Sequence, residues 1–210
     1  MKTQESPMVF IVDDDLRVRE AFCSLLTSAG YCVVAFATAT EFLESSKPDC
    51  PSCLILDLEL PDINGLAVQK QIREGHGPPI IFITGHGDIP TSVRAIKSGA
   101  IEFLLKPVKK DTLFPVVEEA LMRDRAAREA RFQQSELRKR YAKLTPRERE
   151  VLPFVVSGFA NKNTAAELGN SGFTIGIQRG QVMRKMGAQS LAELIRMADR
   201  LGIHALDRNC

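Results

Sequence analysis

Five short apolar segments, each followed by a stretch with helical spacing, occupy the first 121 residues of the chain. Continuous apolar runs between amphipathic stretches are typical of strands that helices cover on both faces. The alternation predicts an α/β domain with a five-stranded, parallel, doubly wound sheet. The predicted strands are Met8–Val12, Tyr31–Phe36, Cys53–Leu56, Pro79–Ile83 and Ile101–Leu105, and the predicted helices between them are Leu16–Ala29, Thr40–Ser45, Gly65–Arg73 and Ile89–Ser98.

The rest of the chain carries helical signals. A long helix is expected from Asp111 onward, because residues 116–142 contain neither Gly nor Pro. Capping boxes at Thr145–Glu148 and Ser190–Glu193, with glycines at 169 and 187, predict four short helices after it. We therefore expect a first domain over residues 1–122, a helical linker over 123–142 and an all-α domain over 143–210.

Charge is distributed unevenly between these parts. Residues 1–121 carry 11 basic and 17 acidic side chains, residues 122–142 carry 7 and 3, and residues 143–210 carry 10 and 6. A basic second half suits a polyanion such as nucleic acid. The sequence has no apolar run near the roughly 18 residues that cross a bilayer and no apolar signal peptide. We expect a cytoplasmic protein without a membrane partner.

Polar side chains stand at the ends of the predicted strands. Asp13 and Asp14 follow the first strand, Asp57 follows the third, Thr84 the fourth and Lys106 the fifth. The carboxyl ends of parallel strands share one edge of a sheet, so these groups converge. Clustered carboxylates suit Mg²⁺, a hard cation that binds oxygen ligands. A nucleophilic carboxylate, a cation and a lysine together favour transfer of a phosphoryl group.

The same segments resemble the receiver domains of two-component response regulators over about 120 residues. The resemblance implies a flavodoxin-like fold, with Asp57 as the phosphoacceptor. It also implies that Thr84 and Phe103 form a switch pair and that the Lys106–Pro107 bond is cis. The resembling segments are Val9–Asp15, Leu54–Asp57, Leu60–Gly65, Ile83–Asp88 and Phe103–Pro107.

The resemblance further implies how Mg²⁺ is held. The ligands would be the carboxylates of Asp14 and Asp57 and the backbone carbonyl of Glu59, with Asp13 acting largely through water. A phosphoryl group on Asp57 adds nearly two negative charges. Thr84 would move toward it, Phe103 would fill the space left behind, and the altered surface would dimerise.

The last part of the chain resembles the LuxR-type output domain of the NarL/FixJ branch over residues 144–202. The resemblance implies a helix-turn-helix whose third helix enters the DNA major groove, in a dimer on two half-sites. It rests on Leu144–Leu152, Asn161–Lys162, Ala165–Gly169 and Val182–Ala188. The residues expected to face phosphates are Asn161, Lys162, Thr174, Arg184 and Lys185, and those expected in the groove are Ile177, Gln178, Arg179 and Gln181.

Several residues depart from this family pattern. Gly176 stands where the family places a basic base-reading residue, and Gly176 and Gly180 each cost about 1 kcal/mol of helix propensity against Ala. Pro153 falls inside the first helix, where proline costs about 3 kcal/mol. Thr164 and Asn170 occupy positions that are usually apolar. These departures leave two alternatives open: a DNA-binding domain with atypical base contacts, or one that no longer reads DNA.

The leading hypothesis is therefore a transcription regulator that a cognate histidine kinase switches by phosphorylating Asp57. Its partners would be promoter DNA, RNA polymerase and, after phosphorylation, a second copy of itself. The alternative is a phosphorylation-dependent protein-binding module. An enzyme is not expected, because a phosphatase of this type has a second Asp where this chain has Glu59.

Cys50 and Cys53 have the C-x-x-C spacing of a redox pair or of half a zinc site. Two ordinary thiols at the junction of a loop and a strand are the third interpretation. A redox pair should open a helix, whereas here an apolar strand follows, and the sequence has no second close pair of Cys or His residues.

Overall fold

The computed structural model describes residues 6–74, 77–85, 89–204 and 206. The chain forms two compact units, Met1–Arg128 and Glu129–Cys210. Each unit has a hydrophobic core of its own. The two units are described separately below.

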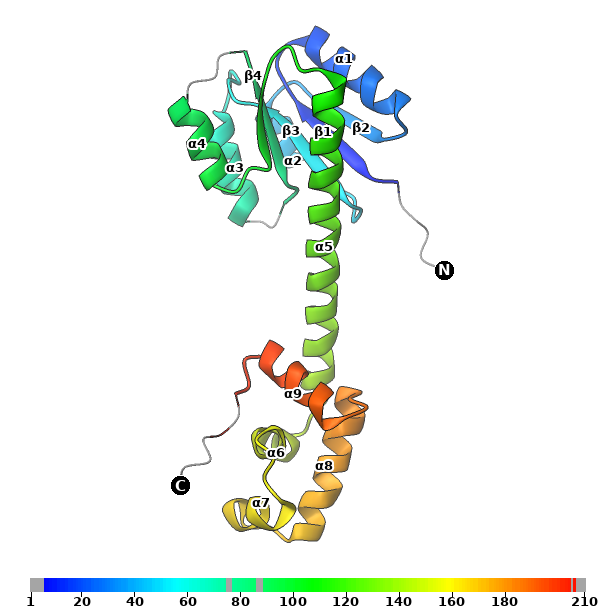
Figure 1. Ribbon diagram of the computed structural model, residues 1–210, viewed down its shortest axis with the longest axis vertical. Coiled ribbons are helices and arrows are strands. Elements are labelled where there is room, and N and C mark those ends of the chain that lie inside the picture. Colours follow the sequence, from blue (N-terminus) through cyan, green and yellow to red (C-terminus); the bar gives the residue numbers. More distant parts are fainter. Residues whose placement is uncertain (1–5, 75–76, 86–88, 205, 207–210) are drawn as a thin grey trace. The chain divides into compact units, whose positions relative to one another are not determined.

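The first unit is a parallel sheet of five strands in the order β2-β1-β3-β4-β5, with helices on both faces (Figure 1). This confirms the predicted fold class. The strands are β1 (Met8–Val12), β2 (Cys32–Phe36), β3 (Ser52–Asp57), β4 (Ile80–Thr84) and β5 (Glu102–Leu105). The helices are α1 (Leu16–Ser28), α2 (Ala39–Glu44), α3 (Gly65–Glu74), α4 (Ile89–Lys97) and α5 (Lys110–Ala142).

Alternate residues of the three central strands enter different cores. Val9 of β1 and Ile55 of β3 face a core that α1 and α5 complete, whereas Phe10 and Leu54 face the core under α2 and α3. Successive side chains of a strand point to opposite faces, so a strand covered on both faces is apolar at every position. All residues of β3 and β4 are buried, as their continuous apolar runs predict.

The two edge strands differ from this expectation. Residues of β2 and β5 are largely half-buried or exposed, although β2 is entirely apolar and β5 is apolar after Glu102. Each has one neighbouring strand and lies at the rim of the helical layers (Figure 1). The apolar pattern identified these segments as strands, but their place at the edge depends on the strand order.

Helix α5 is fixed to the sheet by a polar network as well as by apolar packing. Leu113 and Val117 lie in the core beside β1 and β3. Further along, the buried carboxylate of Asp124 accepts a hydrogen bond from the backbone N–H of Ser52 at 2.8 Å and one from Arg128 Nε at 2.6 Å. The α5 segment up to Arg128 is thereby tied to the start of β3.

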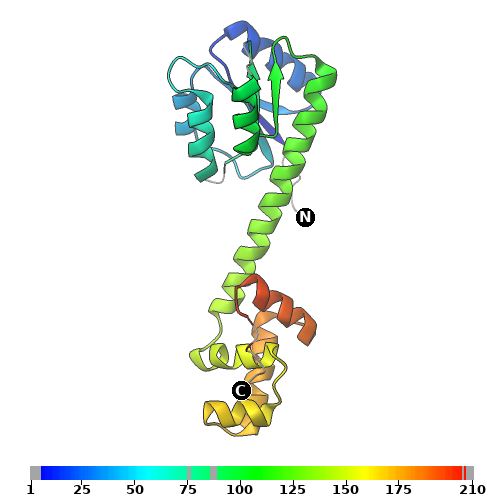
Figure 2. The same ribbon diagram turned by 60° about the vertical axis from the view of Figure 1, so that its left-hand side comes forward.

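The second unit is a cluster of four short helices together with the last turns of α5 (Figure 2). Leu137 of α5 is buried in the same core as Leu152 and Val182, and the Arg140 side chain donates to the Met186 carbonyl at 3.2 Å. The core therefore includes a residue that precedes 143, where the second domain was predicted to begin. The helices are α6 (Pro146–Val156), α7 (Asn161–Leu168), α8 (Gly172–Met186) and α9 (Leu191–Arg200).

The irregular residues of this unit are accommodated locally. The Thr164 hydroxyl donates to the Ala160 carbonyl at 3.2 Å, and the Asn170 amide donates to the Leu168 carbonyl at 2.9 Å. The expected cost of burying unpaired polar groups at these positions is thus avoided. Helix α6 continues through Pro153. The predicted capping box at Thr145 is present in full.

Replacing Asp124 with Ala should lower the free energy of unfolding of the first unit by about 2–3 kcal/mol. The substitution leaves the buried Ser52 N–H without its acceptor and removes the buried one of the two carboxylates that pair with Arg128. Urea unfolding of the full chain measures the change. Glu119→Ala is the matched control, because its carboxylate forms an exposed pair with Arg123 on the same helix; it should cost less than about 0.5 kcal/mol. Equal effects of both substitutions would contradict a role for the buried network.

Candidate functional site

The strand register places Asp13 beside Asp57. Val12 of β1 pairs with Leu56 of β3, so the next residues of both strands are neighbours at the carboxyl edge of the sheet. Asp13 is fully buried and Asp57 is 5% exposed. Two carboxylates at this depth repel each other unless a cation lies between them.

The cation is the ammonium group of Lys106. Thr84 of β4 pairs with Leu105 of β5, so Lys106 follows at the same edge of the sheet. Its Nζ lies 2.6 Å from Asp13 Oδ2 and 2.6 Å from Asp57 Oδ2. Burial alone would lower the pKa of Lys106, but the hydrogen bonds and charges of the two carboxylates outweigh it and raise that pKa. Lys106 therefore remains charged and joins the ends of β1, β3 and β5.

The second oxygen of each carboxylate is held by the backbone. Asp13 Oδ1 accepts from the N–H of Asp15 at 3.0 Å, and Asp57 Oδ1 accepts from the N–H of Glu59 at 3.1 Å. Each side chain is thus fixed between a backbone amide and Lys106. The loops that follow β1 and β3 therefore already hold both carboxylates in this orientation.

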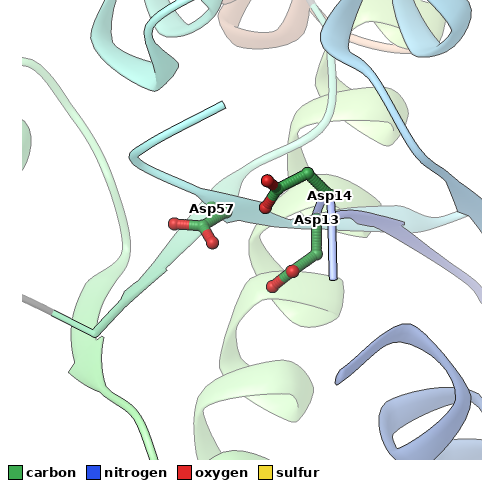
Figure 3. Close-up of side chains that lie close together, drawn as sticks. All are labelled: Asp13, Asp14 and Asp57. Carbon is green, nitrogen blue, oxygen red and sulfur yellow. The ribbon is translucent and has the colours of Figure 1, made fainter. Parts of the chain in front are cut away.

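Asp14 completes a group of three carboxylates. Asp13, Asp14 and Asp57 each offer an oxygen, and these oxygens lie within 4.8 Å of one another (Figure 3). Burial raises the pKa of Asp13, although Lys106 opposes the shift. Lys106 balances one of the three negative charges, so the site favours a further cation. Hard oxygen donors at a partly exposed edge fit Mg²⁺, which retains several waters.

Thr84 and Phe103, the predicted switch pair, lie on the neighbouring strands β4 and β5. Thr84 is fully buried at the end of β4. Phe103 is half-buried and pairs in register with Phe82, their ring centroids 6.4 Å apart. The Lys106–Pro107 bond that follows is cis, as the resemblance implies.

Two residues that support the loop after β3 were not identified as site residues from the sequence. A Cβ on Gly65 would lie 2.8 Å from the carbonyl oxygen of Asp57, so only glycine fits there. The Asp62 carboxylate accepts from the backbone and hydroxyl groups of Thr40 at 2.9 and 2.8 Å. Burial alone would raise the pKa of Asp62, but the hydrogen bonds from Thr40 lower it to about 2.

Cys50 and Cys53 do not form a reactive pair. Both are buried thiols that form no disulfide, and burial raises the pKa of Cys53 to about 12. A thiol with so high a pKa supplies little thiolate at neutral pH. In the part of the chain that the structure describes, neither belongs to a group of potential metal ligands; His76, His86 and Cys210 lie outside it. The interpretation as ordinary buried thiols is the one that the structure supports.

In the second unit, α7 and α8 form the predicted helix-turn-helix. Gly169 ends α7 with a left-handed backbone, φ +62°, and the Ser171 side chain caps α8. Lys162 is exposed near the start of α7, and Asn161 is half-buried. The Thr174 hydroxyl lies 2.9 Å from Ser171 Oγ in the first turn of α8.

Three residues expected to contact DNA also have partners within the domain. Gln181 Oε1 accepts from the Arg184 guanidinium at 2.6 and 3.1 Å. Lys185 Nζ lies 2.7 Å from the Glu148 carboxylate, which is 8% exposed. This contact ties α8 to α6, a packing role that the sequence did not reveal. It helps to lower the pKa of Glu148 against the opposing effect of burial.

The remaining groove candidates differ in exposure. The Ile177 side chain is 52% exposed, whereas Arg179 is half-buried. Gln178 is half-buried too, and its Oε1 is buried without a hydrogen-bond partner in the described structure. Gly176 faces Asn161, whose Nδ2 would lie 3.2 Å from an added Cβ.

None of the helices that the structure describes is both long enough and apolar enough to cross a membrane.

Comparisons with known families match both units. The response regulator receiver domain matches residues 9–118, which include the strand-end cluster. The luxR family of bacterial regulatory proteins matches residues 142–198, which include α7 and α8.

Relatives of known identity match nearly the whole chain. Nodulation protein W of Bradyrhizobium diazoefficiens is 48% identical over 199 residues, covering 94% of this chain and 88% of that protein. Response regulator protein TmoT of Ectopseudomonas mendocina is 45% identical over 202 residues, covering 96% and 91%. The solved structure of response regulator StyR superposes with a TM-score of 0.84 at 41% identity, covering 93% of this chain and 99% of that one. The chain therefore belongs to the two-component response regulators, the transcription regulators that join a receiver domain to a LuxR-type DNA-binding output domain.

Proposed function

We propose that Asp57 accepts a phosphoryl group from a cognate histidine kinase and that this step promotes dimerisation and binding to promoter DNA. The observation that carries the proposal is the 2.6 Å contact of Lys106 with both Asp13 and Asp57. It places the Asp57 carboxylate at the edge of the sheet, beside a cation that can pair with an incoming phosphoryl group.

In the transfer step, one carboxylate oxygen of Asp57 forms a bond to phosphorus as the bond from phosphorus to the kinase imidazole breaks. Lys106 then pairs with an oxygen of the phosphoryl group. Mg²⁺ in this site supplies charge neutralisation for the entering phosphoryl group. The residues that would hold it are Asp14, Asp57 and the Glu59 carbonyl, with Asp13 acting through water.

The phosphoryl group is read by the side chains around it. Thr84, buried at the end of β4, supplies a hydroxyl donor to the added oxygens. Phe103 on the neighbouring strand is half-buried and can follow into the space that Thr84 leaves. These movements would alter the surface of α4 and β5, a two-state response to a local charge.

That surface already carries exposed apolar groups suited to dimerisation. Val93 and Ile96 of α4 are 43% and 42% exposed, and Leu105 of the edge strand β5 is 56% exposed. The phosphorylated dimer would present two output domains to two half-sites of promoter DNA and recruit RNA polymerase there. Because promoter DNA is the proposed target, the proposed location is the cytoplasm.

The first test is phosphorylation of the full chain by acetyl phosphate with Mg²⁺. Intact-mass spectrometry should show the gain of one phosphoryl group, and both Asp57→Ala and chelation of Mg²⁺ should abolish it. Asp111→Ala, which removes an exposed carboxylate of α5, is the control and should react as the unaltered chain does. Full modification of Asp57→Ala would place the acceptor elsewhere.

A second test concerns the α4–β5 surface. Leu105→Lys should prevent dimerisation of the phosphorylated chain, because it places a charge in the proposed apolar interface, and sedimentation velocity should show a monomer. Leu16→Lys is the matched control, since Leu16 of α1 is also 56% exposed. A phosphorylated Leu105→Lys dimer as stable as that of the control would rule this interface out.

A third test is a gel-shift titration against promoter fragments at several salt concentrations. The phosphorylated chain should retain DNA and Asp57→Ala should not, and Lys162→Ala should reduce the slope of log affinity against log salt by about 0.9 per protomer, one phosphate contact. Lys110→Ala, an exposed lysine of the first unit, should leave the slope unchanged. If no state of the chain retains DNA at low salt, the protein-binding module takes the place of this proposal.

A further inference from the structure

The first half of the outward face of α8 carries two exposed apolar side chains. Phe173, at 80% exposure, is the most exposed large apolar side chain in the described structure, and Ile177 is 52% exposed. They are four residues apart on one helix, so they are neighbours on its surface. Adjacent large apolar side chains exposed on one helix face are a feature of interaction sites.

The helical period separates this face from the core. At roughly 100° per residue, Phe173, Ile177, Gly180 and Arg184 fall on one side of α8. The buried residues Ile175, Val182 and Met186 fall on the opposite side. The face that carries Phe173 and Ile177 is therefore turned away from the core of the domain.

Two of the polar side chains expected to read bases lie elsewhere on the helix. Gln178 and Arg179 flank the buried side, and both are half-buried. The Gln181 side-chain oxygen holds the Arg184 guanidinium at 2.6 Å. The outward face thus offers apolar groups where polar base contacts were expected.

Two glycines shape the surface around Phe173 and Ile177. A Cβ added to Gly180 would meet no atom within 4 Å, so this position is open on its outer side. Gly176 packs beside Asn161 of α7. Without side chains at these positions, the α8 backbone can approach a ligand closely while Phe173 and Ile177 project from it.

The charges nearby indicate what that ligand is. Lys162 of α7 and Arg184 of α8 are exposed, and residues 143–210 carry 10 basic against 6 acidic side chains. An apolar strip beside exposed cations complements the DNA major groove, whose walls are phosphates. On its floor, the thymine C5-methyl is the apolar group that side chains such as Phe contact.

We propose that Phe173 and Ile177 are the specificity-determining residues of this output domain, and that they select thymine by contact with its C5-methyl group. The inference rests on the proposed binding of DNA and adds the chemistry by which bases are distinguished. Half-sites are accordingly chosen for thymines at the positions under these two side chains. Cationic side chains contribute affinity through the phosphates.

The test uses the phosphorylated full chain and a library of duplexes with a randomised central segment. Selected duplexes should share thymines at fixed positions in each half-site. Those thymines are then replaced by deoxyuridine, which removes the methyl group and keeps every hydrogen-bonding group. Each methyl lost should weaken binding about fourfold, the value of one buried CH₂ group.

Substitutions assign the effect to residues. In Phe173→Ala and Ile177→Ala, replacing thymine by deoxyuridine should no longer weaken DNA binding at the thymines that the removed side chain contacts. Ile195→Ala, at a 42% exposed isoleucine of α9, is the matched control and should retain the full loss. Phe173 is largely in solvent, so its replacement leaves the core of the domain unchanged.

The outcomes separate this inference from the proposed function. If no duplex is retained in any state, DNA binding itself fails. If duplexes are retained but show no thymine preference, or bind equally with deoxyuridine, DNA binding stands and the thymine-reading role is overturned. A deoxyuridine effect that persists unchanged in both α8 variants overturns the assignment to Phe173 and Ile177.

Discussion

The Lys106 ammonium, 2.6 Å from both Asp13 and Asp57, is the interaction on which the receiver site depends. Without it, two buried carboxylates would face and repel each other at the ends of adjacent strands. The same lysine joins the end of β5 to the ends of β1 and β3, although neither of these strands pairs with β5. A phosphoryl group on Asp57 would therefore alter the contact between Lys106 and Asp57 that holds the end of β5. The same contact thus belongs to the phosphorylation site and to the structural response.

Strand β3 is held at both ends by one continuous stretch of chain. Lys106 binds Asp57 at its carboxyl end, and the buried Asp124 binds the Ser52 N–H at its start. The first turns of α5 lie between Lys106 and Asp124 in sequence, and Leu113 and Val117 pack these turns against the sheet. The start of α5 is therefore coupled to the phosphoacceptor strand by charge, by hydrogen bonding and by apolar packing.

The sequence predicted what depends on local pattern. Continuous apolar runs identified the strands, and Asp57 and Lys106 at matching strand ends identified the site. It did not predict contacts that depend on how helices pack. Lys185 has the sequence context of a phosphate-binding residue, but it pairs with Glu148, 37 positions away, because α6 lies against α8. The side-chain direction of Gln178 likewise depends on which face of α8 packs into the core. No single residue of the sequence reveals which face that is.

If the exposed apolar side chains of α8 read thymine as proposed, dimerisation and DNA recognition would depend on each other in this chain. Contact with one thymine methyl discriminates by about fourfold, whereas a bidentate hydrogen-bonded contact to a base contributes about 1–3 kcal/mol. One output domain that reads methyl groups through Phe173 and Ile177 is therefore a weak discriminator. Two copies on paired half-sites multiply their preferences. Phosphorylation of Asp57, by assembling two copies, would then supply selectivity as well as affinity.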